Sequence, residues 1–282
     1  MRLSPSIRRL QWRVGRRLYA GARGEPRRNL ATDNGETYLQ RAVIEATAAE
    51  RAVCFMDIGA NQGDWSLPLL RALGGSQRTP QTIKLHLFEP VPETRARLVS
   101  NIAKAQGRRL ATIHAYALSD AAGTAQMAIL SETGGTNTLA VDEGTRVQAR
   151  RIIDVETMTL SAFCDLNAID RVQLVKCDTE GHDAKVIRGA HPLLLQGRID
   201  MLQFEYNHRW VFGRAYLKDV FDLIEGLPYR VARLLPGGIE TYDEWHPELE
   251  RFFEANFVIV RKPVLHWLNV RQGTFDGANT YA

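Results

Sequence analysis

Apolar residues recur at two different spacings from Gly35 onward, and the alternation between them predicts an α/β fold. Short apolar runs with the length of buried strands occupy residues 52–58, 83–89, 110–118, 172–178, 200–206, 229–235 and 256–262. Stretches with helical periodicity separate most of them, at residues 36–51, 64–73, 93–106, 217–225 and in a segment that ends near 195. Strands that alternate with helices form a mainly parallel sheet covered by helices on both faces. The last two runs are joined by a loop, so we expect at least one antiparallel strand in a seven-stranded mixed sheet.

The first 30 residues follow a different pattern, that of a basic amphipathic helix. Five apolar residues recur at spacings of three and four: Leu3, Ile7, Leu10, Val14 and Leu18. Nine arginines stand against Glu25 alone, so this segment carries +8 and the other 252 residues sum to −4. Such a helix is expected to anchor on an anionic membrane, to bind an acidic partner, or to dock on its own domain. We therefore divide the chain into an extension (1–34), a catalytic-size domain (35–265) and a tail (266–282).

Composition narrows the location and the class of partner. The three cysteines, Cys54, Cys164 and Cys177, lie far apart, and two of them fall inside apolar runs, which suits buried thiols in a reducing compartment. No apolar run is long enough to span a membrane, and the N-terminus lacks the apolar segment of a secretory signal. We expect a cytoplasmic protein, either free or peripheral on the inner face of the membrane. Nucleic-acid binding is not expected, because the main domain is mildly acidic and has no basic stripe interleaved with aromatic residues.

Acidic residues follow five of the predicted strands at their carboxyl ends. They are Asp57, Glu89, Asp120, Asp178 and Glu205. In an open α/β sheet the ligand binds at this edge, so the acids are candidates for a binding site. The alternative is that they only cap the helices that follow.

The loop after the first strand, within FMDIGANQGDW (55–65), distinguishes between two nucleotide cofactors. A dinucleotide fold needs G-x-G-x-x-G for close approach to a pyrophosphate, whereas Gly59 and Gly63 here form G-x-x-x-G. Asp57 precedes them and would repel a pyrophosphate, but it suits the cationic end of S-adenosylmethionine. Glu89 is placed to accept hydrogen bonds from ribose hydroxyls. A nicotinamide-dependent oxidoreductase is the weaker alternative.

Five segments together resemble the FkbM family of S-adenosylmethionine-dependent methyltransferases: FMDIGANQG, LFEPVPETRARLVSNI, YALSDAAG, KCDTEGHDAKVIRGA and NFVIVRK. The resemblance spans about Gly35 to Lys262 and implies a class I methyltransferase (Rossmann-like) fold and methyl transfer to an oxygen of a sugar, glycolipid or polyketide-like acceptor. The residues that it implies for the cofactor are Asp57, Gly59, Ala60, Asn61, Gly63, Glu89 and Pro90, with Ser119 and Asp120 by the adenine and Asp178 near the methyl group. Asp183 departs from the family, which more often has glutamate there.

The chemistry needs a group that removes the proton of the acceptor hydroxyl. Asp178, Glu180 and His182 alternate after the fourth predicted strand, and His182 titrates in the useful range. His182 is therefore a candidate base, although it would equally fit a helix N-terminus; Glu180 would then hold the substrate or act as the base. A non-catalytic module that binds S-adenosylmethionine and docks on a membrane-associated assembly is the alternative from another functional class.

Two further segments are candidates for the acceptor site. FEYNHRW (204–210) offers Glu205, Asn207, His208 and an aromatic plate, Trp210, which together suit a sugar or similar polyol. TGGTNTL (133–139) is either a loop that closes over the acceptor, with Asn137 as a hydrogen-bonding group, or an ordinary connection. Asp178, Glu180 and Glu205 would also suit magnesium, which is not favoured, and no spacing suggests zinc.

Overall fold

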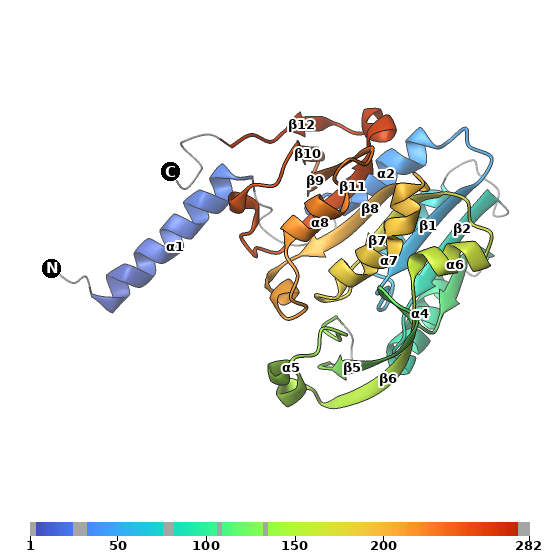
Figure 1. The fold of residues 1–282 in the computed structure, drawn as a ribbon, viewed down its shortest axis with the longest axis horizontal. Helices are drawn as coiled ribbons and strands as arrows, with labels where there is room; N and C mark the ends of the chain where they lie inside the picture. Colours follow the sequence, from blue (N-terminus) through green and yellow to red (C-terminus); the bar gives the residue numbers. More distant parts are fainter. Residues whose placement is uncertain (1–3, 25–32, 76–81, 106–108, 132–134, 276–282) are drawn as a thin grey trace.

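The computed structural model describes residues 4–24, 33–75, 82–105, 109–131 and 135–275, and a nine-stranded sheet forms its centre (Figure 1). The strand order is β12-β10-β9-β11-β8-β7-β1-β2-β3. The strands of this sheet are β1 (Val53–Ile58), β2 (Ile83–Phe88), β3 (Ala111–His114), β7 (Val172–Cys177), β8 (Ile199–Tyr206), β9 (Tyr229–Leu235), β10 (Gly238–Tyr242), β11 (Ala255–Arg261) and β12 (Val270–Gln272).

The predicted mixed sheet is confirmed, and two strands are added at one edge. β1, β2, β3, β7 and β8 pair in parallel, whereas β11 lies antiparallel to both β8 and β9, as expected for the last pair of runs. β10 and β12 extend the sheet from seven strands to nine. β10 follows β9 after only Pro236 and Gly237, and β12 lies beyond residue 265. The folded domain therefore continues past the predicted boundary.

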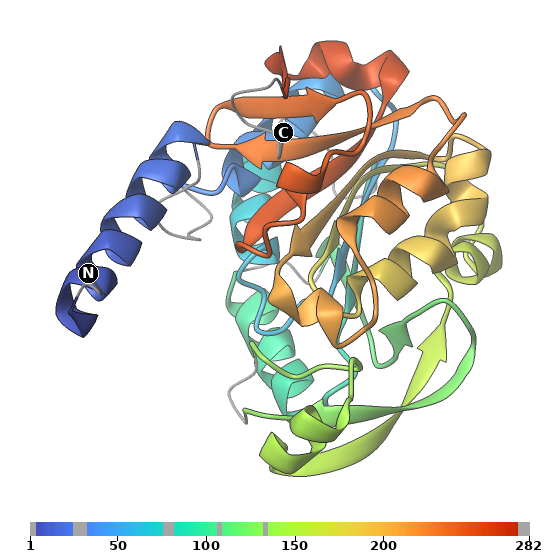
Figure 2. The same ribbon diagram turned by 60° about the vertical axis from the view of Figure 1, so that its left-hand side comes forward.

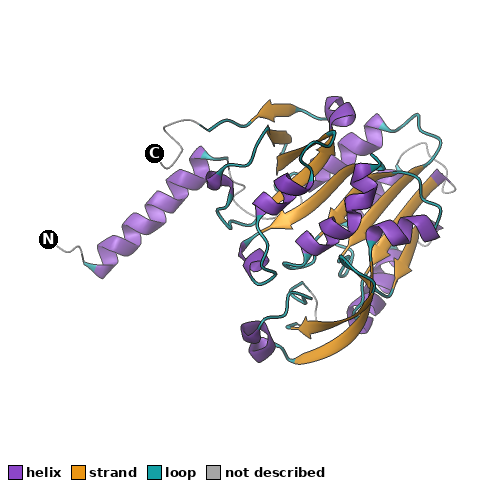
Figure 3. Cartoon of the chain, in the orientation of Figure 1, coloured by secondary structure: helices purple, strands orange, loops and turns teal. Residues whose placement is uncertain are grey.

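Helices cover both faces of the sheet (Figure 3). One face packs against α6 (Leu160–Leu166), α7 (Asp183–Leu195) and α8 (Leu217–Leu223), and the other against α2 (Glu36–Ala46), α3 (Ser66–Gly74) and α4 (Pro92–Lys104). The side chains of β1 point to both faces. Met56 and Ile58 belong to the core beneath α6, α7 and α8, whereas Val53 and Phe55 belong to the core beneath α2, α3 and α4. Successive side chains of a strand point to opposite faces, so a strand covered on both sides reads as one continuous apolar run.

A second, three-stranded sheet was not predicted. It has the order β4-β6-β5 and consists of β4 (Ala117–Leu118), β5 (Gly123–Ile129) and β6 (Arg151–Met158), with α5 (Glu143–Gln148) beside it (Figure 2). The apolar run at 110–118, expected as one strand, is split: β3 pairs with β2, whereas β4 leaves the main sheet and pairs with β6. Its core, which includes Ala117, Met127 and Val155, is separate from the two main cores.

The basic segment forms α1 (Pro5–Ala22), which extends away from the rest of the chain (Figure 1). Ser4 caps its N-terminus by accepting a hydrogen bond from the backbone of Ile7. None of its residues is buried. Within the described residues, no helix is both long enough and apolar enough to cross a membrane. Leu3, the first residue of the predicted apolar face, lies outside the described residues.

Candidate functional site

A cavity lies between the carboxyl ends of the parallel strands and the three-stranded sheet. Its space, open mouth included, measures about 810 Å³. Of the predicted cofactor residues, Gly59, Asn61, Glu89, Pro90 and Asp178 line it. The three-stranded sheet and the loop beside it contribute Ala117, Leu118, Met127, Gly135, Asn137 and Leu139. The sequence did not point to Met127, because the sheet that presents it was not predicted, whereas Gly135, Asn137 and Leu139 belong to the predicted loop 133–139.

Gly59 allows the loop after β1 to pass close to the end of β7. The backbone at Gly59 has φ of +79°, and a Cβ there would lie 2.0 Å from the carbonyl oxygen of Asp178. The backbone N–H groups of Gly59 and Ala60 both donate to the carbonyl oxygen of Phe88, at the end of β2. This position therefore requires glycine both for its conformation and for lack of space. Ala60 and Gly63 shape the loop without lining the cavity.

Glu89 is a buried carboxylate that lines the cavity. Its two oxygens accept hydrogen bonds from the backbone N–H groups of Val91 and Asn61, at 2.9 and 3.0 Å. These bonds fix the carboxylate at the mouth of the Gly59 loop. Burial raises the pKa of Glu89 to about 7, against the lowering effect of the two N–H donors.

Asp57 does not line the cavity, although it was predicted to contact the cofactor. Its side chain is 2% exposed and accepts a hydrogen bond of 2.5 Å from the Ser66 hydroxyl, at the start of α3. Burial raises the pKa of Asp57 to about 7, although Ser66 and Lys176 act in the opposite direction. In this structure the bond between Asp57 and Ser66 joins the end of β1 to the start of α3, the two elements that the Gly59 loop connects.

Two acceptor atoms on residues that line the cavity have no hydrogen-bond partner among the described residues. They are Oδ1 of Asn61 and Oδ1 of Asp178, and both are shielded from solvent. A buried acceptor without a partner costs free energy, on the order of 1–3 kcal/mol. Two of them at one cavity therefore favour a ligand that brings hydrogen-bond donors.

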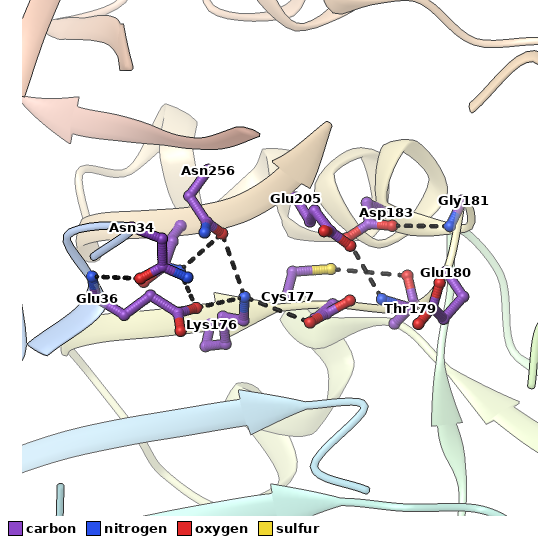
Figure 4. A network of polar contacts seen from close by, with 12 residues as sticks. Asn34, Glu36, Lys176, Cys177, Thr179, Glu180, Gly181, Asp183, Glu205 and Asn256 are labelled. Atoms are coloured by element: carbon purple, nitrogen blue, oxygen red, sulfur yellow. Dashed lines mark hydrogen bonds and ion pairs between the residues drawn. The ribbon is translucent and has the colours of Figure 1, made fainter. Parts of the chain in front are cut away.

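Lys176 is the buried cation behind this wall, and the sequence did not single it out. Its ammonium lies 2.7 Å from Oε1 of Glu36 and 3.4 Å from Oδ2 of Asp178, and it donates to Asn256; Figure 4 shows it between Glu36 and Asn256. Burial opposes its charge, but Glu36, Asp178 and Glu205 outweigh burial and raise the pKa of Lys176 well above its ordinary value. Since these carboxyl groups outnumber Lys176, the surroundings favour a positively charged ligand.

Asp183 holds the turn between β7 and α7. Its carboxylate accepts hydrogen bonds from the backbone N–H groups of Thr179 and Gly181, at 3.4 and 3.2 Å (Figure 4). An aspartate is therefore long enough for the position where the family more often has glutamate. The turn places Glu180 at a positive φ of 56° and at the cavity wall.

The segment 204–210 contacts the cavity wall through Arg209, which was not among the residues predicted for the acceptor site. Trp210 is completely buried, and its indole N–H donates to the backbone oxygen of Glu205, so it is not an open plate for a sugar. Asn207 caps a short helix by accepting from the N–H of Arg209, and His208 is exposed and does not line the cavity. Arg209 instead forms an ion pair with Glu180. Glu205 is buried as well, and desolvation raises its pKa well above the ordinary value.

His182 lies outside the cavity lining. It is 5% exposed and its Nε2 lies 2.9 Å from the Ser119 hydroxyl, which also donates to Asp120. Burial lowers the pKa of His182 to about 4, so the ring is neutral near pH 7. Neither Ser119 nor Asp120 lines the cavity, where Ala117 and Leu118 form the wall instead. These three residues tie α7 to the segment after β4.

The loop that contains Asn137 covers part of the cavity. Oδ1 of Asn137 accepts from the backbone N–H groups of Leu130 and Ser131, and the Thr138 hydroxyl donates to the backbone oxygen of Glu180 at 2.8 Å. The loop is thus connected to both the small sheet and the turn after β7. Residues 133 and 134 of the predicted segment lie outside the described residues. No cluster of three or more potential metal ligands occurs in the part of the chain that the structure describes.

Several solved methyltransferases are similar to this chain. A methyltransferase FkbM from Methylobacillus flagellatus KT is 13% identical, with 74% of this chain and 44% of that chain covered and a TM-score of 0.46. The methyltransferase domain of METTL16 is 11% identical (79% and 64% covered, TM-score 0.44), and an O-methyltransferase from Bacillus cereus in complex with SAH is also 11% identical (80% and 80% covered, TM-score 0.41). The chain thus spans less than two thirds of the first two proteins. No curated protein matches.

The family assignment comes from the sequence segment that builds the cavity. The family model described as the methyltransferase FkbM domain matches residues 57–231, which run from the end of β1 to the beginning of β9. This segment is more than half of the chain and includes all the cavity-lining residues. The chain therefore belongs to the methyltransferase FkbM domain family.

Proposed function

We propose that this protein is an S-adenosylmethionine-dependent methyltransferase that methylates a hydroxyl oxygen of a neutral acceptor such as a sugar, glycolipid or polyketide-like molecule. The observation that carries the cofactor assignment is the pair of unsatisfied acceptors, Asn61 Oδ1 and Asp178 Oδ1, in a cavity whose surroundings are rich in carboxyl groups. The ammonium and sulfonium groups of the cofactor fit both the acceptors and the charge. Glu89 would accept hydrogen bonds from the ribose hydroxyls, and Ala117 and Leu118 would pack against the adenine.

The bound cofactor would supply a methyl group on a positively charged sulfur, which is already a strong methyl donor. The protein must then orient the acceptor, exclude water and accept a proton. Asp178 and Glu180 are the described carboxylates that line the cavity besides Glu89. Arg209 holds Glu180 in place through an ion pair. We assign Glu180 to the acceptor side, where it would bind the hydroxyl and take its proton.

The character of the wall supports a neutral acceptor with hydroxyl groups. Thr179, Glu180 and Asn137 are polar, and Met127 and Leu139 are apolar, whereas no lysine or arginine is among the described lining residues. A phosphate-rich acceptor such as a nucleic acid would need such cations. A polyol with an apolar face matches this mixture better.

The test has two parts, binding and turnover. Calorimetric titration with S-adenosylmethionine should show binding, and the reduced dinucleotide NADH should show none. A panel of methyl glycosides and polyketide-like alcohols is then assayed for S-adenosylhomocysteine, with the methylated atom of any product determined by NMR. Binding without turnover on any hydroxyl acceptor would favour the non-catalytic alternative, and a product methylated on nitrogen or carbon would overturn the O-methylation assignment.

A further inference from the structure

The helix α1 contributes no residue to the cavity, and its apolar residues are exposed. Ile7 is 46% exposed, Leu10 62%, Val14 45% and Leu18 69%. We call these four residues the apolar stripe. They recur at spacings of three and four and therefore lie along one side of the helix. An exposed stripe of this kind on a globular domain marks an interaction surface.

The contacts between α1 and the main domain use the opposite side of the helix. The Tyr19 hydroxyl donates to Oε2 of Glu248 at 2.5 Å, and the Tyr19 ring meets Phe253 edge to face. The Arg16 guanidinium lies 4.9 Å from the centre of the Phe253 ring. At 100° per residue, Tyr19 and Arg16 lie about 140° and 160° around the helix from Val14. The domain thus holds α1 with its apolar stripe turned outward, and the expectation that this stripe docks on its own domain is not met.

The charge of α1 decides what covers the stripe. Arg13 and Arg17 lie about 100° and 60° from Val14 and border the stripe on one side. α1 contains no aspartate or glutamate. A second α1 packed against the first would therefore bring arginines together without a compensating charge, which disfavours a helix pair between two copies. A surface that is apolar inside and negatively charged at its border fits both features.

We propose that α1 binds the protein peripherally to an anionic membrane, with the apolar stripe in the outer part of the lipid layer and the arginines at the lipid headgroups. The long arginine side chains reach the headgroup level while their methylene groups cover apolar surface. Because the stripe is only four residues long, binding should be reversible and should depend on charge.

The experiment measures sedimentation of the full chain with vesicles of phosphatidylcholine alone or with one third phosphatidylglycerol. At about 0.1 M salt the protein should sediment at least tenfold more strongly with the anionic vesicles, and about 1 M salt should release it. Arg13→Gln with Arg17→Gln should weaken binding about 20- to 30-fold. Arg41→Gln with Arg51→Gln removes the same charge from exposed sites on the main domain and should weaken it far less.

A second pair of variants tests the apolar stripe. Leu10→Gln with Leu18→Gln should weaken binding to anionic vesicles at least tenfold. The matched control is Leu166→Gln with Leu195→Gln, two leucines of the main domain with similar exposures of 73% and 56%. The control should bind like the unaltered protein. All four pairs replace exposed residues, so their thermal unfolding midpoints should agree.

Three results would overturn the proposal. One is equal binding to neutral and anionic vesicles. Another is a stripe variant that binds as well as its control, since charge alone would then explain the attraction. The third is a lipid-free dimer in sedimentation velocity that the Leu10 and Leu18 substitutions abolish, because the stripe would then be covered by a second copy.

Discussion

Nζ of Lys176 lies 3.4 Å from Oδ2 of Asp178, inside the wall of the cofactor cavity. The same ammonium lies 2.7 Å from Glu36 at the start of α2, so one cation links the first helix of the domain to a carboxylate that lines the cavity. Oδ1 of Asp178 has no hydrogen-bond partner in the part of the chain that the structure describes. The pair therefore holds Asp178 in a fixed orientation at the cavity wall, where its side chain stays 35% exposed.

Replacing Lys176 with methionine should strongly destabilise the protein. The side chains of Lys176 and Glu36 are 5% and 10% exposed, so the substitution leaves a buried carboxylate without its cation. We expect a loss of about 3–5 kcal/mol in the free energy of unfolding, measured by urea denaturation. Lys84→Met, at an exposed position of β2, is the control and should change it little. A loss under about 1 kcal/mol at Lys176 would show that water compensates Glu36.

Glu89→Gln should weaken binding of S-adenosylmethionine by about 1–3 kcal/mol, the cost of losing hydrogen bonds to a charged acceptor. The amide keeps the size of the side chain but only one of the two oxygens that accept backbone N–H bonds, so the thermal unfolding midpoint is measured alongside. Calorimetric titration measures the affinity. Glu93→Gln, an exposed residue at the start of α4, serves as the control. Equal affinities of the two variants would remove Glu89 from the cofactor site.

Cofactor affinity should fall when the pH is lowered below about 7. Burial raises the pKa of both Glu89 and Asp57 to about 7. The ionised form of Glu89 is the better acceptor for ribose hydroxyls, and both charges favour the cationic ligand, so binding must remove any proton held there. The affinity should drop by up to about tenfold per pH unit for each such proton. An affinity that is constant from pH 8 to about 5.5 would contradict this linkage.

The same shifts have the opposite sign for the stability of the ligand-free protein. A carboxyl with a raised pKa in the folded state holds a proton between about pH 4 and 7 that the unfolded chain has lost. Its contribution to the free energy of unfolding is therefore most favourable below about pH 4 and decreases as the pH rises to about 7. Comparing unfolding with and without S-adenosylmethionine at both ends of this range separates the two effects.

Gly59→Ala should abolish cofactor binding and destabilise the protein by more than about 2 kcal/mol, because the new Cβ meets the backbone of Asp178 as well as an unfavourable φ. Gly226→Ala is the matched control. Gly226 has a similar φ of +74°, but no atom lies within 4 Å of the place that a Cβ would take. It should show only the backbone strain, about 1 kcal/mol. Thermal unfolding and titration report both quantities, and equal effects at the two glycines would mean that the close approach is unimportant.

Glu180→Gln should lower kcat by a factor on the order of 100 if Glu180 accepts the hydroxyl proton. His182→Ala should have a smaller effect on kcat, since His182 lies outside the cavity lining and bonds to Ser119. This expectation revises the sequence-based choice of His182 as the base. Initial rates at saturating cofactor distinguish the two. A large loss in His182→Ala together with an active Glu180→Gln would restore His182 to the proton-transfer step.

The sequence by itself determined seven strands of the main sheet, the antiparallel member among them and the edge of the sheet at which the cavity lies. The reason is local: a strand covered on both faces must be apolar along its length, and the carboxyl ends of parallel strands meet at one edge. The Gly59 loop, Glu89 and Asp178 could therefore be assigned to one site from their positions in the chain alone. β10, the second strand from one edge, was missed because its short, mixed sequence resembles a loop.

Only the tertiary structure decided which polar groups meet and which side chains are buried. Arg209 and Trp210 are adjacent in the sequence, which does not show where either side chain lies. Packing buries the tryptophan in the core and brings the arginine into an ion pair with Glu180. Likewise, the spacing of Leu10 and Val14 predicts an apolar face, but only the contacts of Tyr19 show that this face points away from the domain. Periodicity defines the faces of each element, whereas the partner of each face depends on contacts between residues that are distant in the sequence, and these form only when the chain packs.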